Sequence, residues 1–221
     1  CFMKSDGQEY NKKYIQAKVQ SAARHTLTGE KDDAHALRLP PGQVLTQGFP
    51  ILDLGIRPKR EEYAGWTIEF RGKVKNKKTF TLEEIKKKFP KVERTLDFHC
   101  VTRWSRYDIK WGGALLTDIM KEVMPEDSVK YAIFYSYDKY TTNIPFKELF
   151  TDNVLIAYEL DGGDIPPEHG GPVRMIIPTL YGWKSAKFVT AIEFRDEDEP
   201  GFWEVRGYHN HGDPWLEERY S

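Results

Sequence analysis

Hydrophobic and polar residues alternate in several short segments of this chain. The alternation is clearest over residues 66–74, where Trp66, Ile68 and Phe70 are separated by polar residues. A period of two predicts a strand with one buried face. Five further apolar or alternating runs also predict strands, and they cover residues 94–101, 129–137, 153–160, 173–178 and 187–196.

Helical patterns lie between these strands. Residues 79–89 predict a helix, because Thr81 and Glu84 have the spacing of a capping box and Pro90 ends the pattern. Further helices are predicted over 112–123, over 144–150 starting after Pro145, and, polar and weakly amphipathic, over 4–24. Helices and strands alternate without a regular βαβ rhythm, so the predicted fold class is α+β with a mixed sheet.

The domain boundary is predicted near residue 37. Pro40, Pro41 and Gly42 punctuate the chain there, directly after a charged stretch. Residues 1–36 are therefore expected to form an N-terminal helix and linker, and residues 37–221 one compact domain.

Charge and hydropathy exclude some classes of function. Charged residues make up 30% of the chain, but the formal net charge is -1, so a nucleic-acid partner is not expected. No apolar run approaches the roughly 18 residues of a membrane helix, and residues 1–20 lack the pattern of a signal peptide. We expect a soluble protein without a membrane span, in the cytoplasm, with an exported form left open.

One of the two cysteines stands out. Cys100 ends a predicted strand and is followed by Thr102, Arg103 and Trp104, a hydroxyl, a cation and an indole. A buried cysteine is most often a small core residue. A nearby cation would instead favour the thiolate, which attacks electrophiles or binds soft metals. His99 points to the opposite face of the strand, so it is a poor base for a cysteine hydrolase; whether another histidine approaches is left open.

A second group of candidates lies in residues 166–188. His169, Arg174, Lys184 and Lys187 are interleaved with glycines, which allow close approach of a ligand to the backbone, and Ser185 adds a hydroxyl. Arginine and lysine together suit an anionic group, most plausibly a phosphate. The alternative is a solvated basic loop. Neither a Walker motif nor GxGxxG accompanies the group.

The tail carries a third pattern, His209-Asn210-His211. Two histidines at this spacing could bind zinc, but a zinc site needs three or four protein ligands and no partners are evident. Packing of the tail is the favoured interpretation.

Three longer motifs then occur in a fixed order. They are DFHCVTRWS at 97–105, LIAYELDGGDIPPEHGGPVRMIIP at 155–178 and YGWKSAKFV at 181–189. With the segments that flank them, they resemble the molybdopterin-binding domain of the sulfite oxidase family over residues 37–221. The likeness is greatest to short bacterial and archaeal members related to the catalytic subunit of the envelope methionine sulfoxide reductase.

This resemblance implies a fold, a cofactor and a reaction. The fold is the sulfite-oxidase-type molybdopterin-binding fold, and the cofactor is molybdenum-molybdopterin. The reaction moves an oxygen atom to or from a small molecule. Cys100 would be the protein ligand of the metal, with Tyr158 and Arg103 also at the catalytic centre. The implied cofactor-binding residues are Asp53, Leu54, Gly55, Ser136, His169, Arg174, Lys184, Ser185, Ala186 and Lys187.

The sequence also departs from the family pattern. Asp53 stands where relatives carry asparagine or histidine, and an acid beside an anionic pterin is unfavourable unless it binds the ring N–H groups. The arginine that binds sulfite has no secure match among Arg57, Arg103 and Arg106. The resemblance therefore favours reduction of a sulfoxide or another S- or N-oxide over sulfite oxidation.

Two domains of the larger family members have no counterpart in the resemblance. Neither a haem domain nor a C-terminal dimerisation domain is present in the sequence. We therefore expect no haem, a separate electron-transfer partner and a monomer. The alternative function is a non-catalytic module that binds the cofactor or another anion without turnover. The departure from the family pattern at Asp53 is the observation that supports this alternative.

Overall fold

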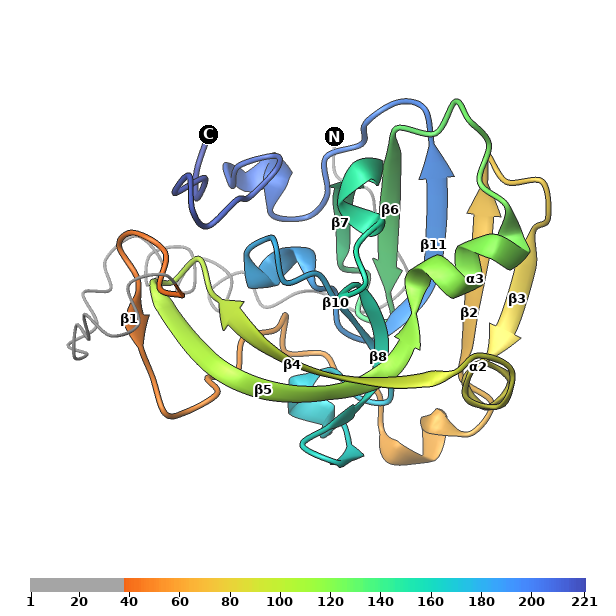
Figure 1. Ribbon diagram of the computed structural model, residues 1–221, viewed down its shortest axis with the longest axis horizontal. Helices are drawn as coiled ribbons and strands as arrows, with labels where there is room; N and C mark the ends of the chain where they lie inside the picture. Colours follow the sequence, from red (N-terminus) through yellow and green to blue (C-terminus); the bar gives the residue numbers. More distant parts are fainter. Residues whose placement is uncertain (1–37) are drawn as a thin grey trace.

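The computed structural model describes residues 38–221, which form two β-sheets with two short α-helices at one end (Figure 1). In the first sheet the strand order is β1-β5-β8-β10, with β4 beside β5 and β9 beside β8. In the second the order is β3-β2-β11-β6-β7. The first sheet comprises β1 Val44–Leu45, β4 Lys91–His99, β5 Trp104–Leu115, β8 Leu155–Leu160, β9 Gly163–Asp164 and β10 Arg174–Ile176. The second comprises β2 Thr67–Gly72, β3 Lys78–Thr81, β6 Tyr131–Ser136, β7 Thr141–Pro145 and β11 Val189–Arg195.

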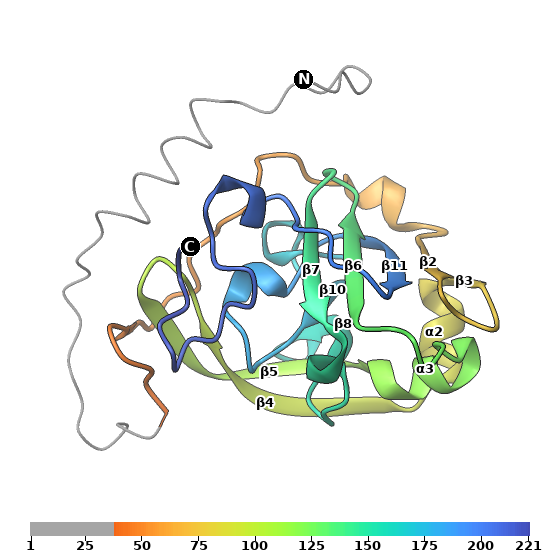
Figure 2. The same cartoon turned by 90° about the horizontal axis from the view of Figure 1, so that it is seen from above.

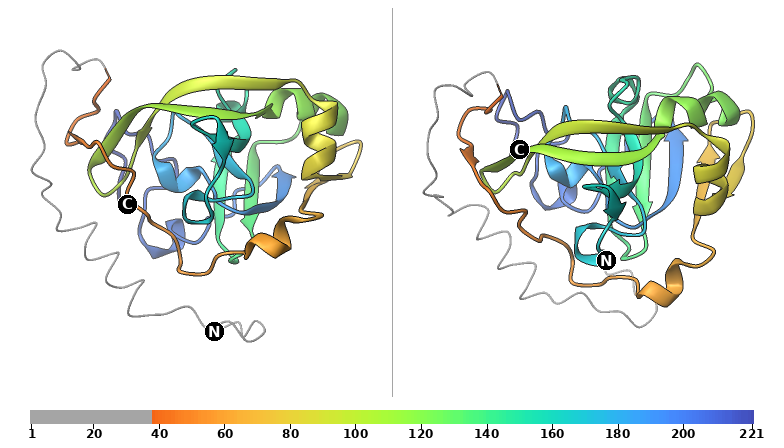
Figure 3. Two further views of the ribbon diagram at one scale, coloured as in Figure 1. Left: turned by 90° about the horizontal axis from the view of Figure 1, so that it is seen from below. Right: turned by 60° about the horizontal axis from the view of Figure 1, so that its bottom comes forward.

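The longest hairpin joins β4 and β5 and runs along one side of the molecule (Figure 3). Strand β5 was missed from the sequence, which predicted a helix from residue 112. Gly113 explains the difference, because a Cβ there would lie 2.3 Å from the Ile156 carbonyl oxygen. Glycine thus lets β5 pair with β8, and helix α3 begins later, at Leu116–Val123.

Helix α2, Leu82–Lys88, begins where the capping pattern predicts. The Thr81 hydroxyl accepts a hydrogen bond from Glu84 N, and the Glu84 carboxylate accepts one from Thr81 N. Leu82 and Ile85 are buried, so the helix is held by both its cap and its apolar face. The predicted helix is confirmed, although its first residues belong to strand β3.

The helix predicted over 144–150, starting after Pro145, is present in part, as a single short turn. Residues Thr141–Pro145 form strand β7, which pairs with β6, and a single 3-10 turn, Phe146–Leu149, follows. Pro145 is tolerated because it ends the strand, where its missing N–H breaks no ladder. All six predicted strands are present; they were expected at 66–74, 94–101, 129–137, 153–160, 173–178 and 187–196. Five are slightly shorter than predicted, and the strand expected at 94–101 is Lys91–His99. The helix predicted over 4–24 lies outside the described residues.

The mixed sheets and two helices confirm the α+β prediction. The C-terminal segment after β11 forms one 3-10 turn, Glu204–Arg206, and then lies over the turn that joins β4 to β5 (Figure 2). Its contact there is direct, because Arg219 Nη1 donates to the Val101 carbonyl at 3.2 Å. Across residues 38–221, no helix is long and apolar enough to span a membrane.

Candidate active site

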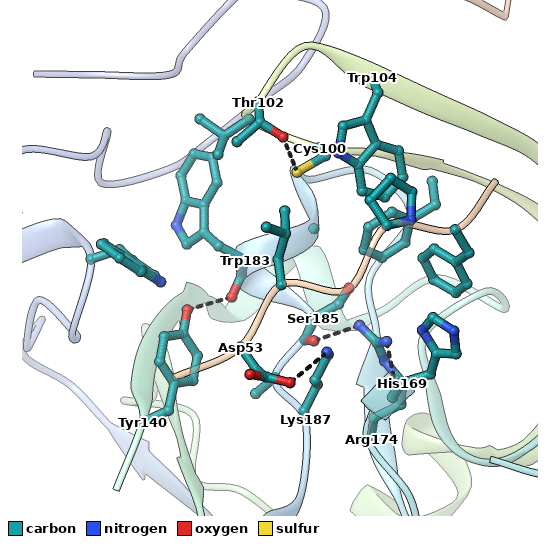
Figure 4. A pocket seen from close by; sticks show the side chains of 18 of the residues that line it. Asp53, Cys100, Thr102, Trp104, Tyr140, His169, Arg174, Trp183, Ser185 and Lys187 are labelled. Carbon is teal, nitrogen blue, oxygen red and sulfur yellow. Dashed lines mark hydrogen bonds and ion pairs between the residues drawn. The ribbon is translucent and has the colours of Figure 1, made fainter. Parts of the chain in front are cut away.

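A cavity of about 370 Å³ lies between the β4–β5 turn and the loop that follows β10 (Figure 4). Five stretches of chain far apart in the sequence contribute to its walls, which suits a ligand site placed by a rigid scaffold. Its polar and aromatic lining residues are Thr46, Phe49, Asp53, Phe98, Cys100, Thr102, Trp104, Asp138, Tyr140, His169, Arg174, Trp183, Ser185, Lys187, Trp203 and Tyr208.

Cys100 lines one end of the cavity, and its thiol is largely buried. Its amide donates to the Trp104 carbonyl at 2.8 Å, which closes the turn between β4 and β5. Its Sγ lies 3.1 Å from Thr102 Oγ1. The next residue, Arg103, has φ 71, in the left-handed region, so the turn is tight. The thiol is therefore fixed at the cavity wall.

His99 is separated from this thiol, as strand alternation predicts. Its Nδ1 lies 2.8 Å from Ser105 Oγ, and it does not line the cavity. Burial lowers the pKa of His99 to about 4, so the imidazole is neutral at pH 7. His169 does line the cavity, but Figure 4 shows it beside Arg174, away from Cys100. Neither histidine is placed as a base for Cys100.

Arg174 is buried in the opposite wall, with 2% of its surface exposed. Its two terminal nitrogens donate to the carbonyl oxygens of His169 and Ser185, at 2.8 and 3.0 Å. Its Nε has no hydrogen-bond partner among the described residues. Burial lowers the pKa of Arg174 to about 9, which leaves it cationic at neutral pH. Within residues 38–221, no carboxylate forms an ion pair with it, and such a buried cation is costly unless an anion binds.

Lys187 lies on the same side of the cavity. Its Nζ donates to the Glu168 carbonyl at 2.6 Å and lies 3.8 Å from Asp53 Oδ2. Asp53 also accepts from Arg57 Nε at 2.8 Å and from the Gly55 amide at 2.9 Å. Burial by itself would raise the pKa of Asp53, but Lys187 and then Arg57 outweigh it and lower the pKa. Asp53 is therefore a paired anion at the cavity wall.

His169 lines the same end of the cavity as Arg174 and Lys187, and it is neutral. Its ring stacks on Phe49, with centroids 4.5 Å apart. Burial, followed by the positive charges of Lys187 and Arg174, lowers the pKa of His169 to about 4. His169 can thus offer a neutral N–H to a ligand but no charge.

Asp138 also lines the cavity and was missed from the sequence. It is 3% exposed, and burial, with a contribution from Asp53, raises its pKa to about 7. The sequence placed the contact at Ser136, which the structure puts in a separate surface groove. Asp138 sits in the tight turn between β6 and β7, and strand β7 was not predicted from the sequence.

Lys184, which was predicted to bind the cofactor, does not line the cavity. The lysine is fully buried, and its Nζ donates to Asn143 O, Asn143 Oδ1 and Asn210 O at 2.8, 3.0 and 2.7 Å. It also lies 2.7 Å from Glu204 Oε1. All of its donors are thereby used within the protein. Its neighbours Ser185, Ala186 and Lys187 do line the cavity, as do Asp53 and Leu54, whereas Gly55 does not.

The two further residues predicted at the catalytic centre are also elsewhere. Tyr158 lies on β8, where alternation turns it into the larger core, and Lys86 Nζ lies 5.5 Å from its ring centroid. Arg103 follows the cysteine but does not line the cavity. Arg106 lies over Phe49 and 3.6 Å from Asp161. Among the described residues, the arginines and lysines that line the cavity are therefore Arg174 and Lys187.

Tyr208 from the C-terminal segment lies in the cavity wall and was not predicted. Trp203 stacks on its ring at 4.9 Å, and Trp183 meets it edge-on at 5.1 Å. Burial, then Tyr220 and Cys100, raise the pKa of Tyr208, so its hydroxyl remains a proton donor. The other phenol of the cavity, Tyr140, donates to the Trp183 carbonyl at 2.6 Å. Tyr208 is thus the phenol near Cys100.

The tail histidines contact carboxylates. His211 Nδ1 lies 2.9 Å from Glu218 Oε2, and its Nε2 lies 3.1 Å from Glu148 Oε1. His209 Nδ1 accepts from the amides of His211 and Gly212. These contacts fold the tail against the domain. No group of three or more metal-binding side chains was found within residues 38–221.

The sequence of this chain is similar to those of known proteins. Residues 55–203 match the family described as the oxidoreductase molybdopterin binding domain. The chain belongs to this family. It is 39% identical over 184 residues to the uncharacterized oxidoreductase YuiH of Bacillus subtilis (strain 168), a match that covers 83% of this chain and 92% of that protein.

Other members of the molybdopterin-binding family are larger. The protein-methionine-sulfoxide reductase catalytic subunit MsrP of Ralstonia nicotianae is 32% identical over 162 residues, which are 66% of this chain but 49% of that protein. The crystal structure of the sulfane dehydrogenase SoxCD from Paracoccus pantotrophus superposes with a TM-score of 0.59 at 16% identity. That match covers 86% of this chain and 62% of the other, and it confirms the sulfite-oxidase-type fold.

Proposed function

We propose that this chain binds the molybdenum-molybdopterin cofactor in the cavity and uses it to reduce a small S- or N-oxide. The observation that carries the proposal is Arg174, a buried cation whose Nε is unpaired in a cavity that presents a thiol at its other end. A ligand with a phosphate at one end and a thiolate-binding metal at the other would give Arg174 an anionic partner and the thiol a metal.

The cavity residues fit such a cofactor. Arg174, Lys187 and the neutral N–H of His169 would hold the phosphate. Asp53 and Asp138 are carboxyl groups suited to the N–H groups of a pterin ring, which answers the objection to an acid at position 53. Cys100 would bind the metal through its thiolate. When bound, the cofactor supplies two-electron exchange of an oxygen atom with a substrate.

The end near Cys100 supports a neutral substrate. Trp183, Trp203 and Tyr208 form an aromatic wall there, and the two cations of the cavity are needed for the phosphate. The Tyr208 hydroxyl is placed to donate a hydrogen bond to the oxygen of a sulfoxide or N-oxide. Sulfite, a dianion, would find no further cation among the described residues that line the cavity. MsrP, by its name, acts on methionine sulfoxide, which agrees with this class.

The overall reaction consumes two electrons and two protons. The S=O or N–O bond of the substrate breaks, the oxygen leaves as water, and the sulfide or amine remains. The electrons would come from a separate redox protein, which is supported by the likeness to MsrP, by its name the catalytic subunit of a reductase. A module that binds the cofactor without turnover is the alternative.

An activity assay separates these functions. Holoprotein from a host that makes the cofactor is supplied with a reduced viologen dye and a dialkyl sulfoxide or an amine N-oxide. In parallel it receives sulfite and an electron acceptor. Oxide-dependent oxidation of the dye supports the proposal. Sulfite oxidation alone would overturn the direction, and cofactor binding without either activity would favour the non-catalytic module.

A further inference from the structure

The Thr102 side chain places a hydroxyl against the Cys100 sulfur. Its Oγ1 lies 3.1 Å from Sγ, and both residues line the cavity (Figure 4). This distance is short for a hydrogen bond to sulfur. In the free thiol either atom can be the donor. A thiolate bound to a metal has no proton, so in the loaded protein the threonine hydroxyl must donate.

The turn holds this hydroxyl in place. Gln43 Nε2 donates to the Cys100 carbonyl at 3.0 Å, and Arg219 Nη1 donates to the Val101 carbonyl at 3.2 Å. The Arg103 amide also donates to the Cys100 carbonyl, at 3.0 Å. Both peptide groups between the cysteine and the threonine are thereby fixed. The β-branched side chain of Thr102 adds a stiff χ1, so its hydroxyl cannot easily leave the sulfur.

We propose that Thr102 donates a hydrogen bond to the Cys100 thiolate and raises the reduction potential of the metal that this thiolate binds. The proposal rests on the function proposed above. A hydrogen bond draws electron density from sulfur, so the thiolate donates less to the metal and the reduced state becomes more favourable. Thr102 is then a positioning residue that acts through Cys100, without touching the substrate.

Two substitutions test this, an isosteric one that removes the hydroxyl and one that keeps it. Thr102→Val keeps the shape and removes the hydroxyl, whereas Thr102→Ser keeps the hydroxyl. The holoproteins are compared by EPR-monitored redox titration and by the visible sulfur-to-metal charge-transfer absorption. We expect Thr102→Val to shift the midpoint potential downward and the absorption to longer wavelength. Thr102→Ser should match the wild type in both.

The outcomes separate the two proposals. Wild-type protein without molybdenum contradicts the proposed function itself. Full metal content with unchanged potential and absorption in Thr102→Val overturns the role of Thr102 alone. Thr102→Ala is a second variant in case Thr102→Val loads poorly. Metal loss in both, with full metal in Thr102→Ser, would make the hydroxyl a requirement for loading and would also overturn its tuning role.

Discussion

Lys184 Nζ lies 2.7 Å from Glu204 Oε1, and both side chains are almost completely buried. This pair connects two segments that meet at the cavity. Lys184 precedes Ser185 and Lys187, and Glu204 follows Trp203. Trp183 Nε1 and Thr142 Oγ1 donate to the same carboxylate oxygen, at 2.9 Å each. The pair therefore fixes the C-terminal segment, and with it Tyr208, against the stretch that carries Ser185 and Lys187.

Replacing this lysine should destabilise the fold. Lys184→Met leaves the Glu204 carboxylate buried without its cation, which costs about 3–5 kcal/mol of unfolding free energy. Denaturant unfolding of the metal-free protein measures the loss. Lys147→Met is the matched control, because the Lys147 side chain is 78% exposed and its loss should cost less than about 0.5 kcal/mol. A loss in Lys184→Met as small as in the control would show that the pair does not hold the tail.

Asp138 should make stability depend on pH. Burial raises its pKa to about 7, above the ordinary value of 3.8, so the folded state binds more protons between these values. The stability that protonation of Asp138 provides is full below pH 4 and lost as the pH rises to 7. In the metal-free protein, the unfolding free energy of Asp138→Asn minus that of the wild type should therefore rise by about 4 kcal/mol from pH 4 to pH 8.

Urea titrations at several pH values measure this difference. The comparison with Asp138→Asn cancels other groups, including His99, whose lowered pKa gives the opposite slope between pH 4 and 6.5. The exposed residue Asp127, changed to asparagine, is the control. A flat difference curve for Asp138→Asn would mean that this carboxyl is already ionised at low pH in the folded protein.

The two tyrosines make opposite predictions for turnover. Tyr208→Phe removes the hydroxyl near Cys100 and should lower kcat for an S- or N-oxide about 10- to 100-fold, as expected for a lost donor to developing charge. Tyr158→Phe should change kcat by less than about twofold, because Tyr158 lies in the core beneath Lys86. Steady-state kinetics at equal cofactor content measure both. Loss of activity in Tyr158→Phe with an active Tyr208→Phe would restore the sequence-based assignment.

Much of the fold could be predicted because its signals are local. Alternation over 66–74 predicts β2, and the Thr81–Glu84 spacing predicts the start of α2. Strand β5 has no such local signal, since Arg106, Tyr107 and Asp108 interrupt its apolar residues and its pairing depends on a glycine that faces β8. Strand β7 is short and ends in proline, which reads as the start of a helix.

Some residues of the candidate site could likewise be predicted from the sequence, and others could not. Cys100 and Arg174 could be placed because each sits in a motif whose residues are adjacent in sequence. Asp138 and Tyr208 reach the cavity only through a hairpin turn and through the fold of the tail, which depend on contacts across the chain. The same long-range contacts take Lys184 out of the site, since Glu204 and Asn143 bind it elsewhere. Residue type alone does not distinguish these cases.

Metal and pterin analysis of the purified protein tests the proposed function most directly. Wild-type protein, Cys100→Ser and Arg174→Met are made in a host that produces the molybdenum cofactor, with Arg60→Met, at an exposed arginine, as control. We expect about one molybdenum and one pterin per wild-type and control chain. Cys100→Ser should lose oxide-reducing activity, and Arg174→Met should lose at least tenfold in cofactor content. Absence of molybdenum from the wild type, with Cys100→Ser indistinguishable from it, would contradict the account.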